Sequence, residues 1–222
     1  ILYRAELGEA IGRIADGVLY PLWDSGLEVG HGVRTLEESM AHAGEDYFFL
    51  VALLDARLID GSRELFAELL DTYGRLFIEG RREEFVEKMK VHRDSRRQRY
   101  GSHSYLLEPH IKEGRGGMRD IQAMLWTARM VFGLQGLPAI EEAGLLLADE
   151  RADFVEARKT LVRLRSYMHH LGRRKTDQLF FEQQGEVAKA FGYSGGDGIL
   201  GVERFMRDVY GALHKVSLIT DL

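Results

Sequence analysis

The chain has 222 residues, of which 45% are hydrophobic and 29% are charged, and it contains no cysteine. This composition is typical of a globular protein with a sizeable core, and it excludes disulfide bonds and thiolate metal sites. The formal net charge of −5 argues against general nucleic-acid binding, and no apolar run approaches the roughly 20 residues that span a bilayer.

The first part of the chain predicts a helix followed by a strand. Apolar residues recur at helical spacing over 2–20. Residues 27–35 then alternate in character, which predicts a strand that carries Glu28 on its polar face. Thr35 and Glu38 have the spacing of a capping box that opens the next helix.

From residue 63 onward the pattern predicts helices. Apolar residues follow one another at spacings of three and four, most regularly over 154–171, where they form the seam of a helical bundle. We therefore expect a mainly α (α+β) protein, with a short α+β part in 1–62 and a helical bundle in 63–222.

The stretch from Ser104 to Gln122 combines an apolar, strand-like run ending at a proline, a basic glycine loop and the start of an amphipathic helix. Glycines let a backbone approach a ligand closely, and a helix N-terminus favours anions. One interpretation is a phosphate-facing corner, and the other is an ordinary turn whose glycines satisfy a backbone bend. The candidate residues are Lys112, Gly116, Gly117, Arg119 and Asp120.

The corner ends a basic segment. Residues 88–119 contain nine Lys or Arg and three Asp or Glu, in a chain that is acidic as a whole. Such a segment can face a polyanionic small ligand, although a solvated helix face is the commoner explanation of a charge run.

The sequence lacks the acidic pair that two-metal phosphoryl transfer requires. Residues two apart on a strand point to the same side, and no two of the 35 Asp and Glu residues have that spacing. The eight histidines show no HExxH pattern, and the glycine-rich stretch 193–201 lacks the Lys-Ser/Thr of a phosphate loop.

Five ordered blocks resemble the family of bacterial PII uridylyltransferase/uridylyl-removing enzymes. They lie at 19–39, 53–66, 104–129, 180–194 and 202–216, and the third reads SYLLEPHIKEGRGGMRDIQAMLWTAR. The resemblance implies a nucleotidyltransferase of the DNA polymerase β type, which uses Mg²⁺ to transfer UMP from UTP to a tyrosine of the PII nitrogen-signalling protein. It further implies a cytoplasmic enzyme, with which the lack of cysteine is consistent.

The resemblance also divides the chain by function. Residues 1–62 would be the end of the transferase domain, with a remnant of its sheet, and 63–222 its helical companion. Uridylyl removal and glutamine sensing would belong to domains that this chain does not contain. Because the first methionine is Met40, we expect a piece of a longer protein.

Site residues follow from the same resemblance. Glu28 falls where the third acidic residue of the superfamily lies, and it would be the one metal ligand in this chain. Lys112, Arg119 and the 116–117 backbone would contact the triphosphate. Since the acidic pair is missing, we expect the piece to be inactive alone. Arg115 stands where the family usually has proline, and His110 where it usually has Asn or Asp.

Two alternatives stay open. Glutamine synthetase adenylyltransferases carry a related glycine block, so the chain could belong with that relative. The helical part could also be a non-catalytic scaffold that docks or regulates a protein partner, in which case the basic loop is structural.

Overall fold

The computed structural model describes residues 1–103, 105–172 and 176–221, and it is mainly helical, as predicted. The chain forms two compact units, Ile1–Arg81 and Arg82–Leu222. The helix α4 (Arg63–Tyr73) therefore lies in the first unit. The predicted functional division at 62/63 stays a prediction.

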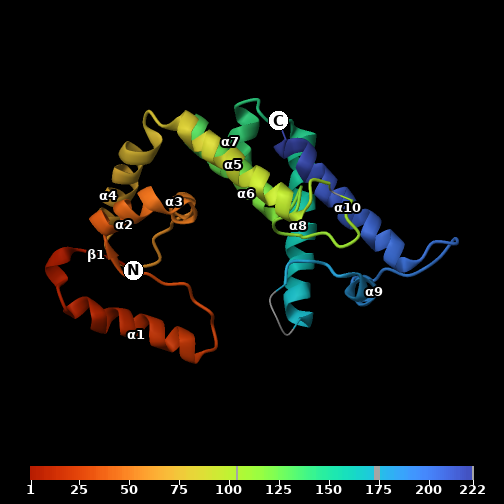
Figure 1. Ribbon diagram of the computed structural model, residues 1–222, viewed down its shortest axis with the longest axis horizontal. Coiled ribbons are helices and arrows are strands. Elements are labelled where there is room, and N and C mark those ends of the chain that lie inside the picture. Colours follow the sequence, from red (N-terminus) through yellow and green to blue (C-terminus); the bar gives the residue numbers. More distant parts are fainter. Residues whose placement is uncertain (104, 173–175, 222) are drawn as a thin grey trace. The chain divides into compact units, whose positions relative to one another are not determined.

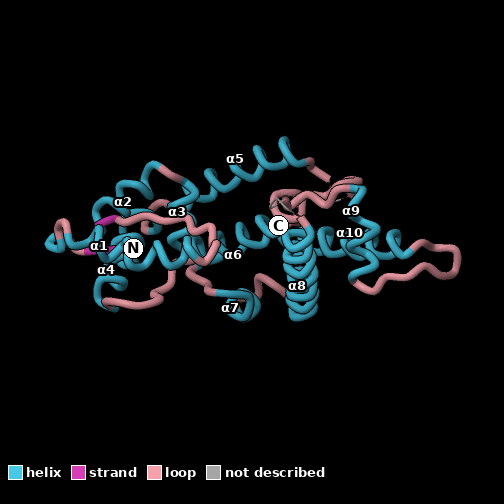
Figure 2. Tube along the Cα trace, turned by 90° about the horizontal axis from the view of Figure 1, so that it is seen from below, coloured by secondary structure: helices cyan, strands magenta, loops and turns pink. Residues whose placement is uncertain are grey.

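The first unit is built from helices and one short parallel pair of strands. Its helices are α1 (Ala10–Asp24), α2 (Leu36–Glu45), α3 (Tyr47–Leu54) and α4, with a 3₁₀ turn at Ala5–Leu7 and a π-helical turn at Gly74–Ile78. Strand β1 (Leu2–Tyr3) pairs with β2 (Arg34–Thr35), and strands are magenta in Figure 2. In this pairing Leu2 lies opposite Arg34.

Capping residues set the starts of α2 and α3. The predicted capping box is present, since Glu38 N–H donates to Thr35 Oγ1 and Thr35 N–H donates to the Glu38 carboxylate. Asp46 accepts the first amides of α3. The buried Tyr73 hydroxyl donates to the Leu50 carbonyl at 2.9 Å, which ties α4 to α3.

The strand predicted over 27–35 is wrong except at its end. Of residues 27–35, all of which the structure describes, Arg34 and Thr35 alone form a strand, and Arg34 N–H donates to Ile1 O at 3.0 Å. A strand needs a neighbour for its backbone groups, and β1 offers two residues. Helix α1 starts eight residues later than predicted and continues to Asp24.

The second unit contains only helices and irregular segments in its described part. They are α5 (Arg82–Tyr100), α6 (Met118–Phe132), α7 (Gly136–Glu142), α8 (Ala148–Leu171), α9 (Phe181–Ala190) and α10 (Gly201–Thr220) (Figure 1). The strand-like run before Pro109 is a loop where the structure describes it, and Ser104 lies outside the described residues. Isolated bridges join His110 to Gln178 and Gly196 to Ile199.

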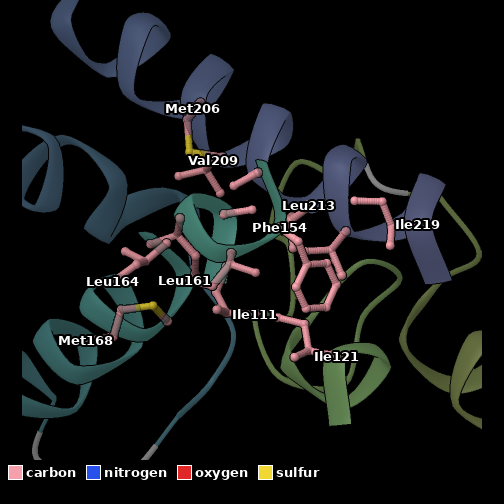
Figure 3. Packing of buried hydrophobic residues seen from close by; sticks show 14 of the residues in the cluster. Ile111, Ile121, Phe154, Leu161, Leu164, Met168, Met206, Val209, Leu213 and Ile219 are labelled. Carbon is pink, nitrogen blue, oxygen red and sulfur yellow. The ribbon is translucent and has the colours of Figure 1, made fainter. Parts of the chain in front are cut away.

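The predicted seam of α8 forms the core of this unit. Its apolar residues pack against those of α10, and α6 adds Ile121 (Figure 3). Ile111, from the loop before α6, is fully buried in the same cluster. Burial of such a side chain stabilises the fold by roughly 1.5–3 kcal/mol. The loop that carries the candidate site is therefore anchored in the core.

None of the helices in the described residues has the length and apolar character needed to cross a membrane.

Candidate functional site

The segment from Pro109 to Gly117 is a tightly tethered loop. Ile111 N–H donates to Asp177 O at 2.7 Å, and Leu179 N–H donates to Pro109 O at 3.0 Å. At its other end, Met118 N–H and Arg119 N–H donate to the carbonyls of Ile111 and Lys112. The N-terminus of a helix usually leaves its first amides free to bind an anion. The first amides of α6 instead donate to carbonyl groups of the loop.

Both glycines of the pair are required by the protein's own packing. Gly116 has φ of +73°, and a Cβ there would lie 1.9 Å from the carbonyl oxygen of Leu213 in α10. A Cβ on Gly117 would lie 2.7 Å from Ile111 O. The close approach that the sequence suggested for a ligand is made by α10 and by the loop backbone.

Asp120 holds this corner to α5. Its side chain is almost fully buried, and its carboxylate accepts from Gly116 N–H at 2.9 Å and from Arg96 Nη2 at 2.6 Å. Arg96 also donates to the Glu113 carbonyl at 3.2 Å. The charge of Asp120 is therefore met by one guanidinium and one backbone amide, as a buried carboxylate requires.

The two basic side chains predicted to face phosphates share one carboxylate. Arg119 lies 3.3 Å from Glu113 Oε1, and Lys112 Nζ lies 3.7 Å from the same oxygen. Arg119 also donates to Gln122 and stacks over the Trp126 ring at 5.7 Å. The Lys112 side chain is 35% exposed and that of Arg119 21%. Lys112 is thus the more accessible of the two cations.

Arg115 ties the loop to the end of α10. Its guanidinium donates to Asp221 at 2.7 Å and to the Ser102 carbonyl at 3.2 Å, and Arg97 of α5 pairs with the same carboxylate. Burial alone would raise the pKa of Asp221, but the hydrogen bonds from both arginines outweigh it and hold that pKa below its ordinary value. Arg115, which stands where the family usually has proline, therefore has an acidic partner in Asp221.

A polar cluster that sequence reasoning missed supports the loop from the other side. Asp177 accepts from Arg165 Nε and lies 2.7 Å from His169 Nε2. These bonds overcome the opposing effect of burial and lower the pKa of Asp177. His110 Nδ1 accepts from Glu113 N–H at 3.0 Å, and its ring packs on Tyr100. The sequence carried no local signal for the pairings of Asp177, because Arg165 and His169 lie on α8 and Asp177 lies in the segment before α9.

Glu28 belongs to the first unit, where it is exposed on the loop between α1 and β2. Among the residues that the structure describes, no group of three or more His, Asp or Glu side chains is placed to hold a metal ion. A role for Glu28 as one of several ligands stays a proposal.

Comparisons with known proteins place the chain in a family. Residues 84–222 match the model of the family described as GlnD PII-uridylyltransferase. A bifunctional uridylyltransferase/uridylyl-removing enzyme of Rhodospirillum rubrum is 36% identical over 208 residues, which cover 94% of this chain and 22% of that protein. Proteins of the same name from Cereibacter sphaeroides and Azospirillum brasilense are 36% and 33% identical, over 93% and 94% of this chain and 22% of each relative.

The chain thus spans about a fifth of the length of the curated relatives that it matches. No solved structure matches it. Because the family model covers most of the chain, including the loop from Pro109 to Gly117 and α6, the chain belongs to the GlnD PII-uridylyltransferase family.

Proposed function

We propose that this chain is part of a cytoplasmic enzyme that transfers UMP from UTP to a tyrosine of a PII signalling protein. The observation that carries the proposal is the family match over 84–222, together with relatives named as uridylyltransferases. In the complete enzyme, Mg²⁺ would lower the charge repulsion around the triphosphate, and glutamine would act through domains beyond this chain.

Within this proposal the candidate residues have different tasks. Lys112 faces the triphosphate as a fixed positive charge and stabilises the negative charge that develops on the leaving pyrophosphate. Arg119, which pairs with Glu113 in this structure, would be a second cationic contact to the triphosphate. Gly116, Gly117 and Asp120 shape the loop and hold it to α5 and α10, which keeps Lys112 in place.

The test uses the complete protein that contains residues 1–222. Lys112→Met should lower kcat/KM for PII uridylylation at least about tenfold, since one charge-assisted contact contributes 1.5–3 kcal/mol. Lys112→Arg should restore part of it. Lys159→Met is the matched control, because Lys159 is exposed on α8 and pairs only with Glu156 among the described residues. Equal activity of the two methionine variants would contradict the role of Lys112.

A second experiment tests the division of the active site. The 222-residue chain, mixed with UTP, Mg²⁺ and PII, should give no labelled PII, because Glu28 is the only candidate metal ligand in it. Labelling would show that the chain carries a complete centre.

In the complete protein, UTP should outcompete ATP as the donor, and the reverse preference would favour the adenylyltransferase relative.

The internal ion pairs of the corner favour a second candidate function. Arg96, Arg97, Arg115 and Arg119 all have acidic partners within the unit, as a docking scaffold with a structural loop would require. Calorimetric titration of the 222-residue chain with UTP distinguishes the transferase role from the scaffold role. If UTP gives no heat and Lys112→Ala weakens PII binding without loss of stability, the scaffold is correct.

A further inference from the structure

The second unit contains a groove that the proposed function does not use. It has a volume of about 400 Å³ and lies between α5, α6, the segment that joins α7 to α8, and the end of α10. We name it the α5–α6 groove. A volume of this size is within the range of small-molecule sites in proteins.

The walls of the α5–α6 groove differ in character. The α6 wall is mainly apolar: it includes Met124 and Phe132 beside the polar Asp120 and Thr127, and Phe132 is 58% exposed. On the α5 side, Met89 is followed by Lys90, Arg93 and Arg97, which recur at helical spacing along one face. The groove therefore has an apolar interior and a row of cations along one edge.

The charges of this edge are unequally available. Arg97 is held by Asp221, and the one acid in the lining, Asp120, is held by Arg96. Lys90 lies 4.0 Å from Glu87, and Arg93 lies 3.4 Å from Asp94, in pairs that are largely exposed. Exposed pairs of this kind contribute at most about 1 kcal/mol, so Lys90 and Arg93 can exchange them for an anion.

We propose that the α5–α6 groove binds an anionic amphiphile, with its apolar chain against Met89, Met124 and Phe132 and its carboxylate or phosphate headgroup at Lys90 and Arg93. A methylene occupies about as much space as a water molecule, roughly 30 Å³, so the groove admits a chain of about ten carbons. A helix of a partner protein is about 10 Å across, so a single turn of it would fill the groove. The groove is therefore too small for a helix of ordinary length. The inference rests on the groove alone and does not depend on the transferase activity.

The first experiment locates the ligand with ¹³C-methyl-methionine labels in the full chain. Decanoate and decyl phosphate, each at about 1 mM, should shift the methyl resonances of Met89 and Met124. Met40, in the first unit, and Met168, a buried residue of α8, should not shift. The two anions distinguish a carboxylate from a phosphate headgroup, while decyltrimethylammonium should leave all four resonances unchanged.

The second experiment tests the headgroup contact. Arg93→Gln should weaken decanoate binding about tenfold, as expected for the loss of a charge-assisted contact, and should leave decanol binding unchanged. Arg99→Gln is the matched control, since Arg99 is exposed on the same helix and does not line the groove. Ala123→Phe, which fills the groove from α6, should abolish binding of decanoate, decyl phosphate and decanol alike. Circular dichroism verifies that this variant is folded.

Three results would overturn the proposal. They are unshifted Met89 and Met124 resonances with both anions, equal shifts with the cationic amphiphile, and equal loss of decanoate binding in Arg93→Gln and Arg99→Gln. The last two would indicate adsorption to apolar surface without recognition of the headgroup.

Discussion

At the scale of single residues, Asp120 is the side chain on which the glycine corner depends most. It is 5% exposed and accepts from both Arg96 and Gly116. Asp120→Asn keeps the shape but leaves the Arg96 charge buried without a counter-charge, which should lower the free energy of unfolding by about 3–5 kcal/mol.

Urea denaturation measures this loss. Asp94→Asn is the control, because Asp94 is 61% exposed on α5 and its pair with Arg93 should contribute less than about 1 kcal/mol. Similar urea midpoints for the two variants would mean that the Asp120–Arg96 pair is not a buried ion pair in solution.

His110 should make the second unit sensitive to mild acid. Burial lowers the pKa of His110 below its ordinary 6.5, although Asp177 and Glu113 act in the opposite direction. The unfolded chain then binds a proton at higher pH than the folded chain does. Stability is therefore full above pH 6.5 and is lost as pH falls from 6.5 through the folded pKa. Burial and Arg96 lower the pKa of His92, which adds an effect of the same sign.

The measurement is the urea midpoint between about pH 7.5 and about pH 5.5. It should fall in the original chain and fall less in the double variant His92→Gln, His110→Gln. Asp177 and Asp221 do not contribute to the change in this pH range. Their pKa values are lowered in the folded chain, so the stability that they provide is lost only as pH falls below the ordinary value of 3.8. A midpoint that stays constant over the window would exclude the effect.

At the scale of elements, the contact of α10 with the loop before α6 explains why position 116 is glycine. Gly116→Ala would place a Cβ 1.9 Å from Leu213 O in addition to forcing alanine into a left-handed conformation. Gly133, at the end of α6, has nearly the same φ of +71° and no atom within 4 Å of such a Cβ. Comparing alanine at positions 116 and 133 therefore separates the cost of the clash with α10 from the cost of the left-handed backbone.

We expect Gly133→Ala to lower the free energy of unfolding by about 1–2 kcal/mol, the cost of the left-handed backbone. Gly116→Ala should lower it by at least about 2 kcal/mol more, since α10 must move away or the loop must distort. Thermal and urea unfolding of both variants give the comparison. Equal losses would show that α10 does not press on the loop.

At the scale of the whole molecule, the connection between the two compact units is the exposed segment 79–82. Compact units protect their backbone from proteases, whereas exposed connections are cut first. Brief trypsin treatment of the native chain should therefore cut first after Arg81, and mass spectrometry should find products 1–81 and 82–222.

The variant Arg81→Gln, Arg82→Gln should slow this cleavage, while Arg75→Gln, in the π-helical turn of the first unit, should not. A first cut inside α4 or α5 would contradict the division into two units at this position.

Local patterns predicted much of this architecture. The seam of α8 and the capping box at Thr35 depend on residues three or four apart, so their spacing is visible in the sequence. The strand over 27–35 failed for the opposite reason, because a strand is stable only with a partner whose position the sequence does not give. The proposed place of Glu28 on that strand failed with it.

The sequence by itself determined the helical character of the chain, its lack of cysteine and of acidic residues spaced two apart, and the ordered blocks, the glycine block among them, that resemble its family. Only the tertiary structure decided how the glycine block is used. Asp120 pairs with Arg96, 24 residues away, and Arg115 pairs with Asp221, 106 residues away. The Ile111 amide donates to the Asp177 carbonyl, and Leu213 of α10 leaves no room for a side chain at Gly116. Such pairings depend on how helices pack, and no spacing rule along the chain encodes them.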